Sequence, residues 1–261
     1  MTQYIYEPKG KAREYGELAL NLYRGCSHGC RYCYVPAATF TDRTAFLTPS
    51  PRKITQSALA RELALLADRQ PPATVFLCFT CDPYQYLDEE LTITRETIKL
   101  LHAHNVGVNI LTKGGHRSAR DFDLLAVRPD ISSYGATLTF LSGADSSHWE
   151  PAATLPWVRM KYLARAHELG IPTWASLEPV IDPLQSLELI RRTAPFVDTF
   201  KVGRWNHDER ANAIDWAAFA RTVVDLLESL GKRYYIKADL AKYLAEPPHR
   251  QQKNKNIVDL L

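Results

Sequence analysis

The sequence predicts an α/β protein, folded as an incomplete (β/α)6-type TIM-like barrel with a short C-terminal extension. Three observations support this fold class. Short apolar, β-rich runs alternate with longer segments of helical periodicity, as in parallel strands joined by crossover helices. The length of 261 residues suits a single α/β barrel domain, and 46% of the residues are hydrophobic, enough for a complete core. About six or seven strand–helix units fit this length, which indicates an incomplete barrel or an open, curved sheet.

The first half of the chain contains strand and helix signals in alternation. Residues 17–23 form an expected strand that leads into a loop with three cysteines. Over 53–68 apolar residues recur at helical spacing, and Pro71 and Pro72 end that helix. A β-rich run over 73–80 ends before Asp82. We expect a helix over 91–104 and a strand over 106–111 to follow.

The second half continues this alternation. We expect a helix over 118–126, a strand over 133–140 and an amphipathic helix over 155–169, which ends at Gly170. Next come a strand over 172–177, a helix over 184–193 and a strand over 197–202. The last long helix, over 214–230, ends at Gly231, and 234–237 is a final short strand. We therefore assign one domain to residues 1–240 and a basic tail to residues 241–261.

Composition narrows the protein class. The net charge of +3 is too small to indicate nucleic-acid binding and does not exclude it. No apolar run reaches membrane-spanning length, and residues 1–15 are charged without an apolar core, so we expect neither a membrane span nor a secretory signal. The cysteines number five, and three of them crowd into eight residues. This pattern fits a reducing, cytoplasmic location better than a disulfide framework.

Polar residues follow the expected strands at the points where they end. Cys26 comes after the first strand, Asp82 after the second, Lys113 after the third and Glu178 after the fifth. The carboxyl ends of parallel strands meet at one edge of a sheet, and ligands of α/β proteins bind there. The sequence therefore predicts one reactive site that collects these side chains.

The spacing of Cys26, Cys30 and Cys33 carries the strongest chemical signal. Three thiolates on one short loop can hold three irons of a four-iron cluster and leave the fourth iron open to a small molecule. A structural zinc site is an alternative, and its fourth ligand would come from His28, Cys78 or Cys81. An accidental group of buried cysteines is less consistent with the polar residues of this loop, so we favour the cluster.

These cysteines, with Tyr32 directly before the third one, form the signature of radical S-adenosylmethionine (radical SAM) enzymes, and the chain resembles that superfamily. The segments 21–34, 80–85 and 111–113 look like its spore photoproduct lyase-like branch, and the resemblance extends from about Tyr6 to Leu240. It implies a [4Fe–4S] cluster and S-adenosylmethionine as cofactors. It also implies reductive cleavage to a 5′-deoxyadenosyl radical, which abstracts a hydrogen atom from a substrate.

The resemblance also implies roles for individual residues. Cys26, Cys30 and Cys33 would be the cluster ligands, and Tyr32 would lie along the adenine. The Gly-Gly-Glu stretch of many members is missing here; in its place stands a segment with Thr80 and Asp82, and Asp82 could pair with the methionyl ammonium or cap a turn. Further candidates for binding the cofactor are Lys113, Thr137, Thr139 and Glu178, each of which could instead be an ordinary loop or strand residue.

Two further thiols, Cys78 and Cys81, are the candidates for a catalytic role. Side chains alternate along a strand, so either register would direct one of these thiols toward the cofactor. In spore photoproduct lyase a cysteine of this region returns a hydrogen atom to the product radical. Aligned on Asp82, that cysteine falls at Phe79 here, so neither thiol matches it, and Cys78 could equally be a small buried apolar residue.

The substrate class follows only from the resemblance. It implies a nucleobase or a modified, thymine-like nucleotide in DNA, with an electron donor such as a flavodoxin or ferredoxin as partner. A peptide or small metabolite is an alternative, although no cysteine follows Cys81 to bind the further clusters of peptide-modifying members. A non-catalytic, zinc-bound nucleic-acid module is the second alternative.

Overall fold

The computed structural model describes residues 3–245, which fold around a seven-stranded parallel sheet. The strand order is β1-β4-β5-β6-β7-β8-β9, so each strand pairs with the next one of the sheet along the chain. Every pair in this sheet is parallel. The strands are β1 (Leu18–Leu20), β4 (Thr74–Leu77), β5 (Gly107–Thr112), β6 (Ser132–Thr137), β7 (Thr173–Val180), β8 (Thr199–Arg204) and β9 (Arg233–Ile236).

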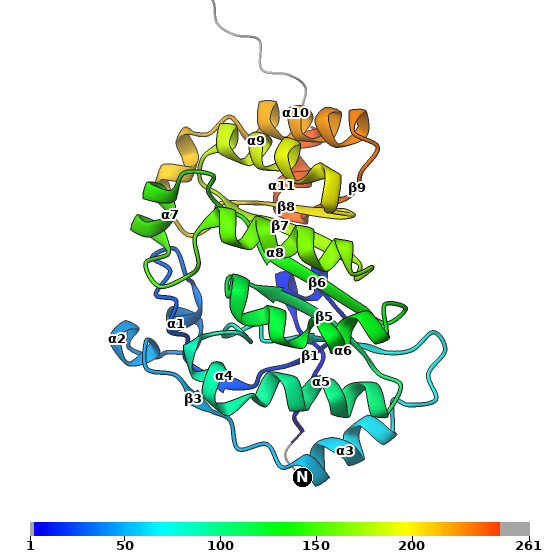
Figure 1. The fold of residues 1–261 in the computed structure, drawn as a ribbon. Coiled ribbons are helices and arrows are strands. Elements are labelled where there is room, and N and C mark those ends of the chain that lie inside the picture. The colour runs from blue at the N-terminus through cyan, green and yellow to red at the C-terminus, as the bar shows by residue number, and fades with distance from the viewer. Residues whose placement is uncertain (1–2, 246–261) are drawn as a thin grey trace, which may run out of the picture.

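Helices connect successive strands and cover the outer face of the curved sheet (Figure 1). The long ones are α3 (Gln56–Ala64), α5 (Ile93–Ala103), α8 (Pro156–Glu168), α9 (Pro183–Thr193) and α10 (Trp216–Ser229). Shorter ones are α1 (Val35–Ala38), α2 (Arg43–Phe46), α4 (Tyr86–Leu91), α6 (Phe122–Val127), α7 (Gly143–Trp149) and α11 (Ala238–Ala241), with five 3-10 helices, η1 (Gly10–Glu14), η2 (Gly115–Asp121), η3 (Ala194–Phe196), η4 (Glu209–Ala213) and η5 (Lys242–Leu244). Alternating strands and helices thus confirm the predicted α/β class.

The sheet is open within the described residues, because β1 and β9 are its two edges and do not pair with each other. The N-terminal segment crosses between these edges. Tyr6 forms an antiparallel bridge to Ala19 beside β1, whereas Glu14 accepts a hydrogen bond from the backbone N–H of Ala238, 2.8 Å away, at the start of α11. A salt bridge from Lys11 to Asp239 adds a second tie. This segment therefore links the two ends of the curved sheet.

Two apolar clusters fill the molecule. The larger one lies between the sheet and the helices that cover it. The smaller one consists of Ala19, Phe76 and Trp174, with Tyr15 and Phe79 packed against it. Gly135 on β6 makes room for the Trp174 indole, because a Cβ there would lie 2.3 Å from the ring. The inner cluster fills the interior of the curved sheet and supports the cavity described below.

Several predicted boundaries shift in the structure. The strand expected over 73–80 ends at Leu77, because Cys78 adopts a left-handed conformation with φ +69. The N-terminal part of the helix expected over 118–126 is the 3-10 helix η2. The patterns did not predict α1, α2, α4, α7 or the small antiparallel pair of β2 (Tyr23–Arg24) and β3 (Ser50–Pro51). These short elements lack enough residues for a periodic signal.

The expected domain boundary after Leu240 falls inside α11, and η5 continues against α10. Residues 246–261 of the expected basic tail lie outside the described residues. No helix among the described residues is both long and apolar enough to cross a membrane.

Candidate functional site

A cavity of about 400 Å³ opens at the carboxyl ends of the strands and reaches into the interior of the sheet. Eleven of the twelve residues proposed from the sequence line it: Cys26, Cys30, Tyr32, Cys33, Cys78, Thr80, Cys81, Asp82, Lys113, Thr137 and Glu178. The remaining one, Thr139, stands one layer behind, where its hydroxyl lies 3.3 Å from the Tyr32 hydroxyl. The structure therefore brings the separate strand ends together as the topology required.

The cysteine loop is held in place through its backbone. The Cys26 N–H donates to the Phe46 carbonyl at 2.8 Å, and the Arg43 guanidinium donates to the carbonyls of Cys30 and Cys33 at 3.3 and 2.9 Å. Gly25 has φ +79, and a Cβ there would lie 2.6 Å from the Phe46 carbonyl oxygen. Only glycine fits this position without moving α2.

The three thiols are enclosed. Cys30 is buried, and Cys26 and Cys33 are partly exposed toward the cavity. Burial raises the pKa of Cys30 to about 12 and raises the pKa values of Cys26 and Cys33 as well. Without cations, the thiols stay neutral at physiological pH. Metal ions reverse this preference, because they bind the thiolate form.

His28, inside the cysteine loop, is fully engaged by protein groups. Its Nε2 lies 3.1 Å from Arg117 Nη2, which can only donate, so Nε2 accepts and Nδ1 carries the hydrogen. Nδ1 faces Asp82 Oδ2 at 3.4 Å. Burial lowers the pKa of His28 to about 4, against the opposing effect of Asp82. Neither nitrogen is therefore open to a metal ion, contrary to the zinc alternative that used this residue.

Asp82 is saturated by its neighbours. Oδ1 accepts from the Thr112 hydroxyl at 2.6 Å and from the Tyr84 N–H at 2.9 Å, and Oδ2 accepts from the Lys113 N–H at 2.7 Å. Burial would raise the pKa of this carboxyl, but His28 and these hydrogen bonds hold it below its ordinary value. The carboxylate thus fixes the two strand-end turns on either side of the cavity.

Tyr32 is anchored by a buried ion pair. Its hydroxyl donates to Glu150, which also forms a salt bridge to Arg159 at 2.5 Å. Arg159 and Glu150 are each 1% exposed. The Lys113 ammonium lies 5.6 Å from the centre of the Tyr32 ring. Burial would lower the pKa of Lys113, but Cys30 and Glu150 raise it above its ordinary value, so this residue stays cationic.

The three threonines predicted from the sequence make different contacts. Thr137 is 4% exposed and lines the cavity. Its backbone carbonyl accepts a hydrogen bond from Arg159 at 3.0 Å. The Thr80 N–H donates to Asn21 Oδ1 at 2.9 Å, and its side chain also lines the cavity. Thr139 supports Tyr32 rather than the cavity.

Cys78 and Cys81 do not lie on a regular strand, so the alternation expected for them is absent. The sequence predicted a strand through Thr80. In the structure the left-handed Cys78 ends β4 and turns the chain, so both thiols line the cavity. Burial raises the pKa of Cys78 well above its ordinary value, so this thiol keeps its hydrogen.

The far wall carries a second polar group around Glu178. Its carboxylate accepts from the Tyr15 hydroxyl and pairs with the Lys237 ammonium, each at 2.5 Å. Gly203 faces this carboxylate, because a Cβ there would lie 2.7 Å from Glu178 Cδ. Lys201 donates to the Glu14 carbonyl at 3.0 Å, and burial, with Lys237 nearby, lowers its pKa to about 8.

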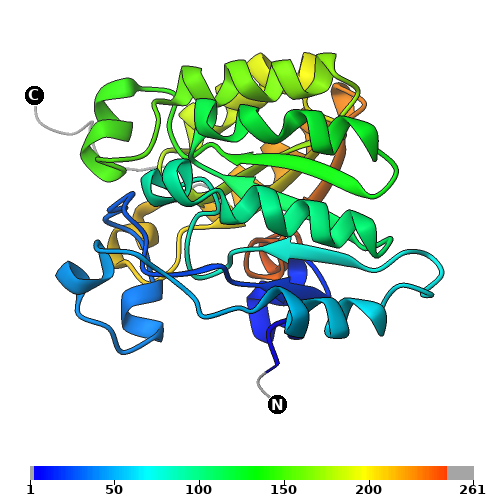
Figure 2. The same cartoon turned by 60° about the horizontal axis from the view of Figure 1, so that its bottom comes forward.

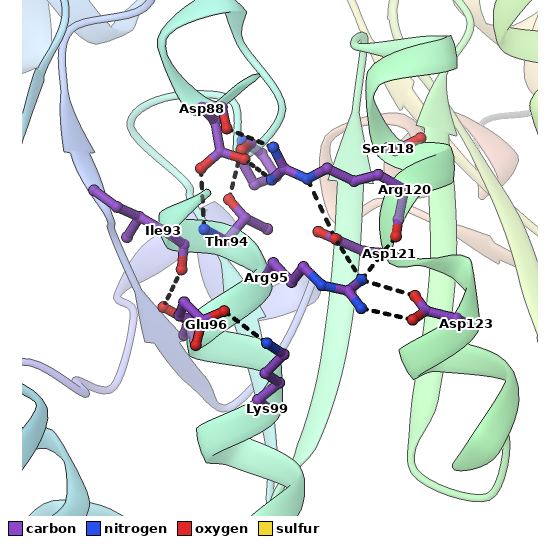
Figure 3. A network of polar contacts seen from close by, with 12 residues as sticks. Asp88, Ile93, Thr94, Arg95, Glu96, Lys99, Ser118, Arg120, Asp121 and Asp123 are labelled. Atoms are coloured by element: carbon purple, nitrogen blue, oxygen red, sulfur yellow. Dashed lines mark hydrogen bonds and ion pairs between the residues drawn. The ribbon is translucent and has the colours of Figure 1, made fainter. Parts of the chain in front are cut away.

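A polar network supports the cysteine loop from behind (Figure 3). Tyr23, which precedes the loop by two residues, donates its hydroxyl hydrogen to Asp88 of α4. Arg120 of η2 pairs with the same carboxylate. Arg95 then reaches Asp123 at 2.6 Å, and Figure 3 shows its guanidinium between two aspartates. The base of the loop is thereby tied to α4 and η2, and through them to α5 and α6.

Sequence reasoning missed several residues of this site. Glu150 directly follows α7, Arg159 lies nine positions later on α8, and nothing local marks either of them as buried. Tyr15 and Lys237 come from opposite ends of the chain, and only the fold brings the Lys237 ammonium over the Tyr15 ring. Arg43 carries no motif, and only the fold shows that it contacts two cysteine carbonyls.

Comparison with known proteins gives a consistent family. The model of the radical SAM superfamily matches residues 20–194. An uncharacterised protein of Mycobacterium tuberculosis is 29% identical over 172 residues, which cover 63% of this chain and 50% of its own length. An uncharacterised protein of Methanocaldococcus jannaschii is 25% identical over 184 residues, or 69% of this chain and 67% of its own. The chain spans about half the length of the mycobacterial relative.

Solved structures share the fold. Spore photoproduct lyase complexed with dinucleoside spore photoproduct has a TM-score of 0.67 at 14% identity, covering 88% of this chain and 79% of its own. Streptococcus suis SuiB bound to S-adenosylmethionine has a TM-score of 0.61 at 14% identity, covering 84% of this chain and 49% of its own. At these identities the likeness concerns the fold.

Proposed function

The chain belongs to the radical SAM superfamily, whose members use a [4Fe–4S] cluster and S-adenosylmethionine, and we propose that it acts on a nucleobase or modified, thymine-like nucleotide in DNA. When bound, the cluster and S-adenosylmethionine supply a one-electron cleavage that leads to abstraction of a hydrogen atom from the substrate. One observation carries the proposal. A single cavity joins three thiols at the strand ends to an aromatic and cationic interior.

The residues present fit the cluster. Thiolates are the ligands that iron–sulfur clusters take, and Cys26, Cys30 and Cys33 open onto one cavity from one loop. Among residues 3–245, no group of three or more His, Cys, Asp or Glu side chains is arranged to hold a single metal ion. We therefore assign the three cysteines as cluster ligands, with Arg43 and Gly25 as the residues that shape their loop.

Lys113 and Asp82 have different roles in binding the methionyl group. No hydrogen bond or ion pair engages the Lys113 ammonium within the described part of the chain, so this cation is open to a carboxylate in the cavity. Asp82 already accepts four contacts and holds the Lys113 backbone. We assign Lys113 to the methionyl carboxylate, and Asp82 to positioning Lys113 rather than to direct pairing with the ammonium.

The interior of the cavity suits a planar, polar base. Phe76 and Phe79 are stacked with ring centres 4.1 Å apart, and Tyr15 meets Phe79 edge-on at 6.0 Å. Hydrogen-bonding groups of Ser176 and Glu178 share this wall, and Lys9 and Lys11 also line the cavity. Aromatic faces bind any base by stacking, and ammonium groups bind phosphates. The structure of spore photoproduct lyase with a dinucleoside lesion is in keeping with this substrate class.

We assign the return of a hydrogen atom to the substrate to a thiol of the Cys78–Cys81 pair. Both thiols line the same cavity as the proposed cluster ligands. Cys78 keeps its hydrogen because burial raises its pKa. A neutral S–H group is the form from which a hydrogen atom can be donated.

The test begins with anaerobic reconstitution with iron and sulfide, followed by S-adenosylmethionine and dithionite. We expect bound iron and 5′-deoxyadenosine from the wild-type protein, and loss of both in Cys30→Ala. Cys78→Ala is the matched control, since it also removes a buried thiol but should keep the iron. Equal iron in the two variants would contradict the ligand assignment.

The substrate is tested with DNA. Mass spectrometry of nucleosides after incubation should show a changed base in unmodified, irradiated or hypermodified DNA, and Cys78→Ala or Cys81→Ala should form 5′-deoxyadenosine with less of that product. Unchanged nucleosides in all three DNA samples would reject the nucleobase proposal. Turnover of a peptide under the same conditions would replace it.

A further inference from the structure

The segment that contains the cysteine loop carries several positive charges without carboxylate partners. Residues 24–53 contain five basic side chains and one aspartate. All five are exposed: Arg24, Arg31, Arg43, Arg52 and Lys53. Within the described residues none of them pairs with a carboxylate, whereas some exposed arginines elsewhere, such as Arg165 and Arg210, do so at 3.1 and 2.6 Å. The aspartate of this segment caps α2.

We call the surface formed by α1, α2 and β3 the α2 face. It is hollowed by a second cavity of about 380 Å³ between Arg24 and Arg52, which is lined by hydroxyl groups and contains no carboxylate. Figures 1 and 2 show α1 and α2 standing together at one side of the molecule, away from the helices that cover the sheet. A cationic cavity that contains no carboxylate favours an acidic partner.

The α2 face also presents an exposed aromatic anchor. Phe40, between α1 and α2, is 98% exposed and has φ +52, a left-handed conformation that is costly for a bulky residue. Leu47, at the other end of α2, is 43% exposed. Exposed aromatic and arginine side chains are enriched in protein–protein interfaces. This combination favours a protein over nucleic acid as the occupant.

The α2 face is joined directly to all three proposed cluster ligands. The Phe46 carbonyl at the end of α2 accepts from Cys26, and Arg43 at its start donates to the carbonyls of Cys30 and Cys33. A redox group that docks on this face is therefore separated from the cluster loop by a single short helix. Nothing else in the described residues connects the surface to all three cysteines.

We propose that the α2 face is the docking surface for an acidic one-electron donor protein, through which the cluster is reduced. The inference rests on the proposed function. In the step the donor, a reduced flavin or iron–sulfur protein, is oxidised by one electron and the oxidised cluster gains that electron; no covalent bond forms or breaks. Opposite charges accelerate such encounters, and salt screens them.

The experiment uses the reconstituted holoenzyme with reduced flavodoxin, and titanium(III) citrate as a small reductant that needs no docking. Stopped-flow absorbance gives the second-order rate of cluster reduction, and calorimetry gives the affinity for oxidised flavodoxin. Arg24→Glu/Lys53→Glu should slow reduction by flavodoxin by about tenfold or more at low ionic strength and weaken its binding, while leaving the titanium reaction unchanged. Phe40→Ala should weaken binding about tenfold.

Arg61→Glu on α3 is the matched control, because Arg61 is exposed and lies away from the α2 face. It should behave as the wild type. Equal rates with flavodoxin in the double variant and the wild type would overturn the inference, as would equal slowing with both reductants. Loss of binding to duplex DNA with unchanged reduction by flavodoxin would identify the face as a nucleic-acid surface instead. Absence of a cluster in the wild type would refute the proposed function, which is a separate outcome.

Discussion

Arg159→Met is the sharpest test of how the site is held together. The guanidinium makes three hydrogen bonds: Nη2 to Glu150 at 2.5 Å, Nη1 to the Thr137 carbonyl at 3.0 Å and Nε to the Thr154 carbonyl at 2.7 Å. Methionine fills similar space without any donor. The variant therefore leaves the Glu150 carboxylate buried without its cation.

The magnitude follows from what remains around Glu150. Removing one partner of a buried ion pair costs about 3–5 kcal/mol. Here the hydroxyls of Tyr32 and Ser146 still donate to the carboxylate, and Lys113 remains nearby. We therefore expect the lower end, about 3 kcal/mol, which corresponds to a fall in Tm of roughly 6–12 °C at this chain length.

Urea denaturation and calorimetry of the wild type and variant give the measurement. Arg165→Met on the same helix is the control, since Arg165 pairs with Glu168 at the surface and its loss should cost less than about 1 kcal/mol. Replacing Glu150 by Leu in the Arg159→Met background should recover part of the loss. Equal destabilisation by the two arginine substitutions would refute the reasoning.

Two further predictions concern a buried lysine and a strained glycine. The pKa of Lys201 is lowered by burial from 10.5 to about 8, so the unfolded chain binds its proton more tightly, and stability should rise with pH between 8 and 10.5. Lys201→Met should lack this rise in a series of urea midpoints, and a rise of the same size in the variant would count against the assignment. Gly25→Ala places a Cβ 2.6 Å from the Phe46 carbonyl oxygen and should lower the iron content after reconstitution. Gly10→Ala, with φ +57 and nothing within 4 Å, should cost only about 1–2 kcal/mol and keep the iron; loss of iron in both variants would show that conformational strain, not the contact with α2, is responsible.

The order of elements was predictable because each long helix and strand carries its own periodic signal. The helices α5, α8, α9 and α10 and the strands β5 to β8 all appear within a few residues of their predicted ranges. Polar residues at the strand ends were found for the same reason: Asp82, Lys113 and Glu178 each follow a predicted strand. Parallel strands then required them to share one edge.

The partners of those residues were not predictable from the sequence. The sequence left two roles open for Asp82, pairing with a ligand or capping a turn; in the structure its oxygens are occupied by Thr112, His28 and backbone N–H groups. The interior position of both Cys78 and Cys81 depends on a single left-handed residue at the end of β4. The alternation of side chains along a strand does not predict such a residue, because it describes only the regular part of the strand.

The sequence by itself determined the chemistry of this protein. A cysteine spacing on one loop, and polar residues at the ends of periodic strands, are local properties that the chain carries in any conformation. Only the tertiary structure decided which groups hold these residues in place, namely Glu150 with Arg159, Tyr15 with Lys237, and Arg43 with the cysteine loop. These groups meet across long stretches of chain or between separate elements, so their contacts come into existence when the sheet and its covering helices pack together.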